Sequence, residues 1–76
     1  MEIKDFIKNL AEQYEEVNLS EFTPETKFKE FDEWSSLTSL SIIAMIDDEY
    51  GVVVKGDEIR QATTVQDLFD IVIAKQ

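Results

Sequence analysis

The sequence predicts an all-α fold, a small four-helix bundle with three longer helices, one short helix and a long first loop. Three segments carry apolar residues at spacings of three and four, which is the period of an amphipathic helix. Cap residues precede two of these segments, and the rest of the chain contains a single candidate strand. A length of 76 residues with 43% hydrophobic content suits one domain, residues 1–76, whose modest core needs no metal or disulfide.

The stretch from Trp34 to Gly51 predicts the longest helix. Ser35 or Ser36 is the expected N-cap, and Gly51 can adopt the left-handed conformation at the C-terminal end. At about 100° per residue, five side chains fall on one arc and form the expected core face: Leu40, Ile42, Ile43, Ile46 and Tyr50. A second, mixed face carries an acid among small and apolar residues: Leu37, Ser41, Ala44 and Asp48. A helix with only a structural role has less need of this second face.

The opening segment predicts the first long helix, because its apolar residues recur at helical spacing among charged ones. We expect this helix to run from Ile3 to Val17 and to fray near its end. The connection from Asn18 to Trp34 has no sustained period, and loops of this length are uncommon unless they are packed. Thr23 to Thr26 is expected to form a single helical turn. Five apolar side chains are expected to anchor the loop across the bundle: Leu19, Phe22, Phe28, Phe31 and Trp34.

The last third of the chain predicts one short and one longer helix. The valines from Val52 to Val54 are expected to form a buried extended loop, since no convincing second strand exists to pair with them. Residues 57–62 should form a short helical turn. Thr64 is the expected N-cap of the final helix, with Asp67 at its third position as in a capping box. The apolar stripe of that helix is Val65, Leu68, Phe69, Val72 and Ile73.

Charge and composition restrict the partners and the compartment. A formal net charge of −10, from seventeen acidic and seven basic residues, argues against nucleic-acid binding and predicts partners with basic surfaces. Solubility alone is the alternative explanation of this charge. The opening residues lack the basic and apolar segments of a secretory signal, and the chain has no cysteine. We therefore expect a cytoplasmic protein that does not insert into membranes.

The chain carries few groups that could support catalysis or metal binding. It has no histidine and no cysteine, so it lacks the usual general base and the best nucleophile. An EF-hand loop starting at Asp47 would need an oxygen ligand at its fifth position and glycine at its sixth, where Gly51 and Val52 stand. The acidic run from Asp47 to Glu49 is thus expected to be a solvated helix end. We predict neither independent catalysis nor a metal site.

The serine-rich start of the central helix is the one chemically interesting position. A serine hydroxyl there lies near unpaired backbone N–H groups and the positive end of the helix dipole. A phosphate ester on Ser35 or Ser36 would be well placed. The structural alternative is that both serines only cap the helix.

The segment WSSLTSLSIIAMIDDEYGV resembles the central motif of acyl carrier proteins, in which an Asp-Ser-Leu triplet opens the second helix. Ser36 matches the modified serine of that family, and Leu37 matches the leucine. The run from Asp48 to Tyr50 lies at the family's spacing from Ser36, and the run from Thr63 to Leu68 matches the start of the last helix. The resemblance covers essentially the whole chain, including its length, helix order, long first loop and acidity.

The resemblance implies a function and a set of partners. Ser36 would carry 4′-phosphopantetheine through a phosphodiester, and the thiol of that group would hold acyl intermediates as thioesters for fatty acid, polyketide or related biosynthesis. The chain itself would not be an enzyme. Its implied partners are a phosphopantetheinyl transferase, an acyl- or aminoacyl-loading ligase, and a ketosynthase or other enzymes with basic surfaces, which a monomeric carrier would visit. The implied docking surface is Leu37, Ser41, Ala44, Asp47 and Asp48.

One departure from the family pattern keeps alternatives open. The residue before the modified serine is usually Asp, and here it is Ser35, which can still cap the helix but lacks the negative charge. Asp32 and Glu33 are expected to replace part of this charge, and Ser35 itself is a minor candidate for modification. Two other functions remain: an aminoacyl or peptidyl carrier for peptide synthesis or D-alanylation, and an unmodified acidic helical module that docks through the same face.

Overall fold

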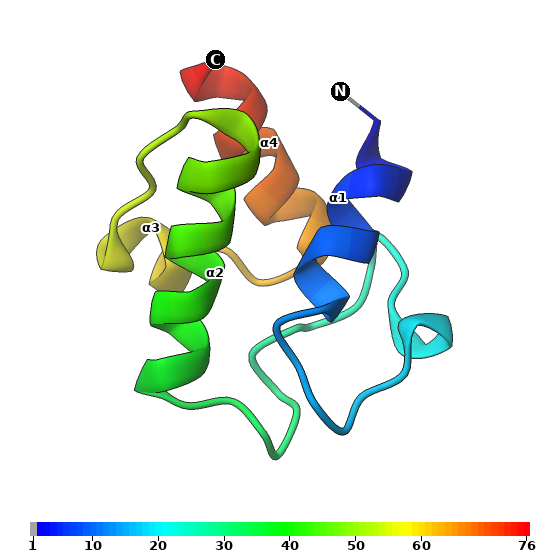
Figure 1. The fold of residues 1–76 in the computed structure, drawn as a ribbon. Helices are drawn as coiled ribbons and strands as arrows, with labels where there is room; N and C mark the ends of the chain where they lie inside the picture. The colour runs from blue at the N-terminus through cyan, green and yellow to red at the C-terminus, as the bar shows by residue number, and fades with distance from the viewer. Residues whose placement is uncertain (1) are drawn as a thin grey trace.

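The computed structural model describes residues 2–76, and in that range it contains four α-helices, one 3-10 helix and no strand (Figure 1). The all-α prediction is therefore confirmed. α2 and α3 contact each other on one side of the molecule, α1 lies on the other side, and α4 contacts both α1 and α3 (Figure 1). The elements in chain order are α1 (Ile3–Ala11), η1 (Leu19–Glu21), α2 (Ser36–Tyr50), α3 (Gly56–Gln61) and α4 (Val65–Lys75).

A single cluster of apolar side chains lies between the helices. All four α-helices contribute fully buried residues to it, and the loops before α2 and after it add one each. Burial of each such side chain stabilises the fold by about 1.5–3 kcal/mol before the entropy of ordering the chain is subtracted. The largest fully buried side chains are Phe6, Phe28, Leu10, Ile42, Ile46, Ile59, Leu68, Val54, Val65 and Val72.

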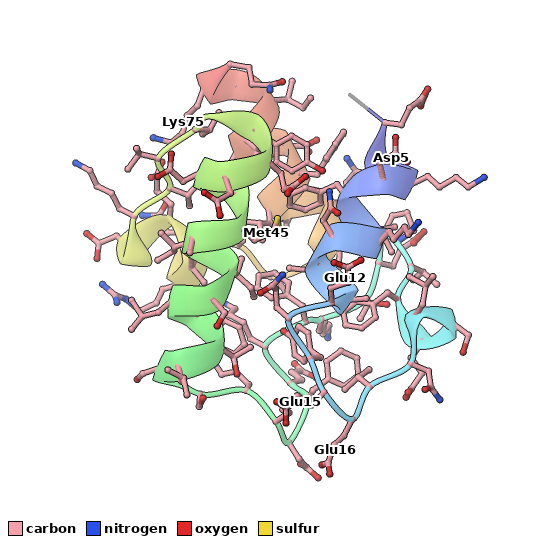
Figure 2. All side chains as sticks on the ribbon, viewed as in Figure 1. Asp5, Glu12, Glu15, Glu16, Met45 and Lys75 are labelled. Atoms are coloured by element: carbon pink, nitrogen blue, oxygen red, sulfur yellow. The ribbon has the colours of Figure 1, made fainter. Side chains whose placement is uncertain are left out.

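The first helix is shorter than the sequence predicts, since α1 ends at Ala11 and not near Val17. Tyr14 is buried all the same, and its hydroxyl donates a hydrogen bond to the Phe28 carbonyl at 2.6 Å. The backbone N–H groups of Glu15 and Glu16 donate to the Glu33 carboxylate, and both residues lie at one tip of the molecule (Figure 2). These bonds to the distant loop replace the bonds that would have continued the helix.

The first loop crosses the bundle as expected, with one anchor wrongly predicted. Phe22 and Phe28 are buried, and Phe31 and Trp34 pack partly buried against the core. Leu19 instead lies on the surface with 51% of its area exposed. The rings of Tyr14, Phe22 and Phe31 form a three-membered cluster with centroids 5.2–5.6 Å apart, a separation that favours aromatic pairing. Burial, and then the nearby Glu33 carboxylate, raise the pKa of the Tyr14 phenol, so it remains a donor.

The loop also closes the start of the last helix. Thr23 to Thr26 forms a single turn, in which the Thr26 N–H donates to the Thr23 carbonyl at 3.1 Å. The carbonyls of Thr26 and Pro24 accept from the N–H groups of Val65 and Gln66 at 3.0 and 2.9 Å. The turn thus supplies acceptors for backbone groups that an isolated helix would leave unpaired.

The core face of α2 is rotated from its predicted position. Ile42 and Ile46 are buried as predicted, but Leu40 is 61% exposed, whereas Met45 and Thr38 are buried in its place. Met45 points from α2 into the bundle (Figure 2). On a helical wheel, Leu40 lies about 120° from Ile46, at the edge of the predicted arc. The helix turns its Met45 side inward, so Leu40 joins the exposed face.

The last third of the chain follows the prediction closely. Val52 and Val54 are buried, Val53 is 64% exposed, and the segment from Gly51 to Lys55 is extended without forming a strand. The predicted apolar stripe of α4 is confirmed at Val65, Leu68 and Val72, with Phe69 partly buried. Ile73 is a wrong prediction, because it lies in the last turn of α4 and is 42% exposed.

Candidate functional site

The two serines at the start of α2 have different roles. Ser35 has extended backbone dihedrals and is the N-cap, and its hydroxyl oxygen accepts from the Thr38 N–H at 3.3 Å. The Thr38 hydroxyl, buried below this cap, donates to the Glu33 carbonyl at 3.0 Å. Ser36 is the first residue of the helix, and its side chain is exposed. Capping by Ser35 thus leaves the Ser36 hydroxyl accessible.

Two backbone donors remain open beside Ser36. In the first turn of α2, the N–H of Thr38 is bonded to the Ser35 hydroxyl and that of Ser39 to the Ser35 carbonyl at 3.0 Å. No acceptor within residues 2–76 pairs with the N–H groups of Ser36 and Leu37. Unpaired N–H groups and the positive end of a 15-residue helix favour an anion. A phosphate ester on Ser36 fits this helix start.

The two acids expected to compensate for the missing Asp differ in their surroundings. The Glu33 carboxylate is bonded to the backbone N–H groups of Glu15 and Glu16, so its charge holds the end of the α1 segment. Asp32 is exposed. The helical periodicity of the sequence could not predict these bonds of Glu33, because its partners lie 17 and 18 residues away along the chain. Asp32 is therefore the better candidate to replace the missing charge.

A groove of about 470 Å³ begins at Ser36 and runs between α2 and α3. Trp34, Leu40, Ile43 and Ile59 give it apolar walls, and Lys29 and Arg60 give it positive charge. The Lys29 Nζ donates to the Arg60 carbonyl at 2.7 Å, which ties the first loop to α3. Leu40, which is 61% exposed, forms part of the groove wall.

The predicted docking residues share the outer face of α2. Leu37 is 74% exposed, and Ala44, Asp47 and Asp48 are also exposed. Ser41 is half-buried, so it lies at the edge of this face. Leu40 was missing from the predicted set, although its position on the helical wheel between Asp47 and Leu37 is a signal that could have found it. Apolar side chains beside two carboxylates are suited to contact a partner with an apolar patch and a basic rim.

The described residues show no grouping of three or more potential metal ligands among His, Cys, Asp and Glu side chains. Among residues 2–76, no helix has the length and hydropathy needed to cross a membrane.

An exposed serine at an open helix start, on a small acidic helical fold, is an arrangement that can accept a phosphate ester. A family model described as "Phosphopantetheine attachment site" matches residues 5–72. An acyl carrier protein from Rubrobacter xylanophilus is 33% identical over 60 residues, which span 79% of this chain and 74% of the relative. The chain therefore belongs to the acyl carrier protein family, and its prosthetic group is covalently attached 4′-phosphopantetheine.

Proposed function

We propose that Ser36 is the attachment residue and that the chain carries acyl intermediates as thioesters. The observation that supports this best is the different use of two exposed serines at the start of α2: the Ser35 hydroxyl accepts the capping bond from the Thr38 N–H, and the Ser36 hydroxyl has no partner within residues 2–76. The prosthetic group supplies a thiol, which this cysteine-free chain otherwise lacks. The remaining work of the chain is to present Ser36, to orient the attached arm and to be recognised.

The chemistry at Ser36 requires an external enzyme. The Ser36 hydroxyl must lose its proton and form an ester bond to the phosphorus of a phosphopantetheinyl donor, while the phosphorus–oxygen bond to the leaving group of that donor breaks. The chain has no histidine to accept the proton. A phosphopantetheinyl transferase would supply the base, while the open N–H groups of Ser36 and Leu37 stabilise the phosphate once it is attached. The chain is thus a substrate and carrier, not an enzyme.

The outer face of α2 is the proposed docking surface. Its apolar part is Leu37, Leu40 and Ala44, and its acidic part is Asp47 and Asp48. The transferase, the loading ligase and a ketosynthase or related enzyme would each present basic residues to this same face. Because both acids are exposed, such contacts should be weak enough to release and sensitive to salt. This suits a monomeric cytoplasmic shuttle that exchanges partners.

The proposed cargo is an acyl group of fatty acid, polyketide or related biosynthesis. An aminoacyl cargo for peptide synthesis or D-alanylation uses the same serine and the same face of α2, so loading by matched ligases separates the two. The unmodified interaction module differs more sharply, because it requires that Ser36 never be esterified.

Intact-protein mass spectrometry after co-expression with a broad-specificity phosphopantetheinyl transferase tests the attachment. We expect the wild type to gain one phosphopantetheinyl unit and Ser36→Ala to gain none, with fragmentation placing the group on Ser36. If the wild type gains nothing, Ser35→Asp restores the usual acid and shows whether recognition alone was lost. A Ser36→Ala protein that is still labelled, or a Ser35→Asp protein that stays unlabelled, would count against the proposed function.

A further inference from the structure

The groove beside Ser36 has an unusual charge for this chain. Its only ionic lining residues are Lys29 and Arg60, both positive, although the chain has seventeen acidic and seven basic residues. Four other surface hollows of the described residues each include at least one carboxylate in their lining. A groove that starts at a phosphate-bearing serine and contains cations alone is suited to a negatively charged ligand.

Both cations have bonding capacity to spare. The Lys29 ammonium uses one of its three N–H groups on the Arg60 carbonyl, at 2.7 Å, and two remain. The Arg60 guanidinium pairs with Asp57, but both side chains are about three-quarters exposed, at 74% and 75%. An exposed pair of this kind contributes little stability, so a ligand can take the place of Asp57. The Arg60 side chain also lies close to Gly56, the first residue of α3. A methyl group added at Gly56 would be 3.7 Å from the Arg60 Nη1 atom.

We propose that the groove between α2 and α3 binds an oxyanion delivered by the arm on Ser36, with Lys29 and Arg60 as its ligands. This inference rests on the proposed attachment at Ser36. Two parts of the loaded arm are oxyanions: its own phosphodiester, and a carboxylate at the free end of a dicarboxylic acyl cargo. The accessible apolar walls at Leu40 and Ile43 would contact the uncharged remainder.

The proposal makes the groove selective by charge. A purely alkyl cargo gains only the apolar walls, whereas an oxyanion also gains charge-assisted hydrogen bonds from two cations. Because Arg60 is exposed and Lys29 half-buried, this gain is screened by salt. Binding of the arm would thus weaken as ionic strength rises, and an arm released from the groove is free to enter a partner enzyme.

Nuclear magnetic resonance on the loaded chain tests the groove directly. The side-chain Nε–H of Arg60 and the backbone amide of Lys29 are followed in the unloaded chain and in chains carrying a free, a butyryl or a succinyl arm. Arg60→Met and Lys29→Met remove the proposed ligands. Lys55→Met is the matched control, because it removes one positive charge from an exposed residue outside the groove lining.

The pattern of shifts identifies the oxyanion. Signals that move with all three arms indicate the phosphodiester, and signals that move only with the succinyl arm indicate the cargo carboxylate. In either case the shifts should disappear at high salt. The Lys29 amide shift should also disappear in Arg60→Met and the Arg60 Nε–H shift in Lys29→Met, whereas both shifts should persist in Lys55→Met. Unmoved Arg60 and Lys29 signals in fully loaded protein, or equal behaviour of Arg60→Met and Lys55→Met, would overturn the proposal.

The intact mass of each sample shows whether the arm is attached, so failure of attachment at Ser36 can be distinguished from failure of the groove to bind the arm. A chain that cannot be loaded counts against attachment at Ser36, and the groove is then tested by titrating free 4′-phosphopantetheine and free succinate into the unloaded chain at low salt. We expect at least one of them to bind about tenfold more weakly to Arg60→Met than to Lys55→Met, as one lost charge-assisted hydrogen bond implies. Equal binding of both to the two variants would overturn the proposal.

Discussion

The starts of α2 and α4 have the same kind of N-cap residue, but they differ in whether the backbone N–H groups that follow the cap are hydrogen-bonded. Each helix has a hydroxyl residue as its N-cap, Ser35 or Thr64, which accepts from the N–H three residues on. At α4 the next acceptors are also present, because carbonyls of the first loop bind the N–H groups of Val65 and Gln66. The corresponding groups at α2, those of Ser36 and Leu37, have no acceptor within residues 2–76.

The residue at the third helical position sharpens this difference. At α4 it is Asp67, whose carboxylate accepts from the N–H groups of Thr63 and Thr64 at 3.0 Å and closes a capping box. At α2 it is Thr38, which is buried and donates away from the helix start to the Glu33 carbonyl. One start is closed by its own fold, and the other leaves room and donors for an added group. A helix start that leaves backbone donors unpaired is therefore a candidate site for an anion.

Amide hydrogen exchange gives the largest expected difference between the two starts. The N–H groups of Val65 and Gln66 should exchange at least about a hundredfold more slowly than those of Ser36 and Leu37, after correction for intrinsic rates, because only the former are hydrogen-bonded. The measurement is native-state exchange of the unloaded chain. Similar protection at all four amides would show that the start of α2 is closed as well.

The two faces of α2 extend the comparison along the helix. Ile46 is fully buried, so Ile46→Ala should lower the free energy of unfolding by about 2–5 kcal/mol through lost burial and a cavity. Leu40→Ala should change it by less than about 0.5 kcal/mol, because Leu40 is 61% exposed. Urea denaturation of both variants measures the contrast. Equal losses would mean that the rotation of α2 is wrongly assigned.

The smallest expected effect is a pH dependence of the unfolding free energy, which arises from Asp67 at the start of α4 and has no counterpart at the start of α2. Backbone hydrogen bonds from Thr64 and Thr63 hold the pKa of Asp67 below its ordinary value of 3.8. A depressed folded-state pKa stabilises the fold above the unfolded-state value, and this contribution is lost as pH falls through the folded-state value. Asp67→Asn should therefore flatten the loss of stability below about pH 4. Acid denaturation curves that differ only by a constant offset would exclude this contribution.

Local signals in the sequence were sufficient for most helix boundaries. Ser35 before the apolar period, Gly51 after it and the pair Thr64 and Asp67 are capping residues whose partners lie within four positions along the chain. Gly51 has the left-handed conformation expected of it, with φ of 65°. The exposed face of α2 also followed from the helical period, since Leu37, Ala44, Asp47 and Asp48 are all exposed; their docking role stays a prediction.

The features that sequence could not predict depend on partners far along the chain. The segment after α1 is bonded to Glu33, whose carboxylate accepts from backbone N–H groups 17 and 18 residues earlier. The rotation of α2, which buries Met45 and exposes Leu40, depends on how neighbouring helices pack against it. The cationic groove joins Lys29 of the first loop to Arg60 of α3, 31 residues apart. Helical period fixes which residues share a face, but only packing decides which face is buried.

The central claim is that Ser35 serves the fold of α2 and Ser36 its function, and one paired measurement tests it. Unfolding free energy and phosphopantetheine loading are measured together for Ser35→Ala and Ser36→Ala. Ser35→Ala should lose about 1 kcal/mol of stability and still be loaded, because the cap is removed but the attachment hydroxyl remains. Ser36→Ala should keep its stability within about 0.5 kcal/mol and lose loading completely. Loading that is lost with Ser35 and retained without Ser36 would contradict the account.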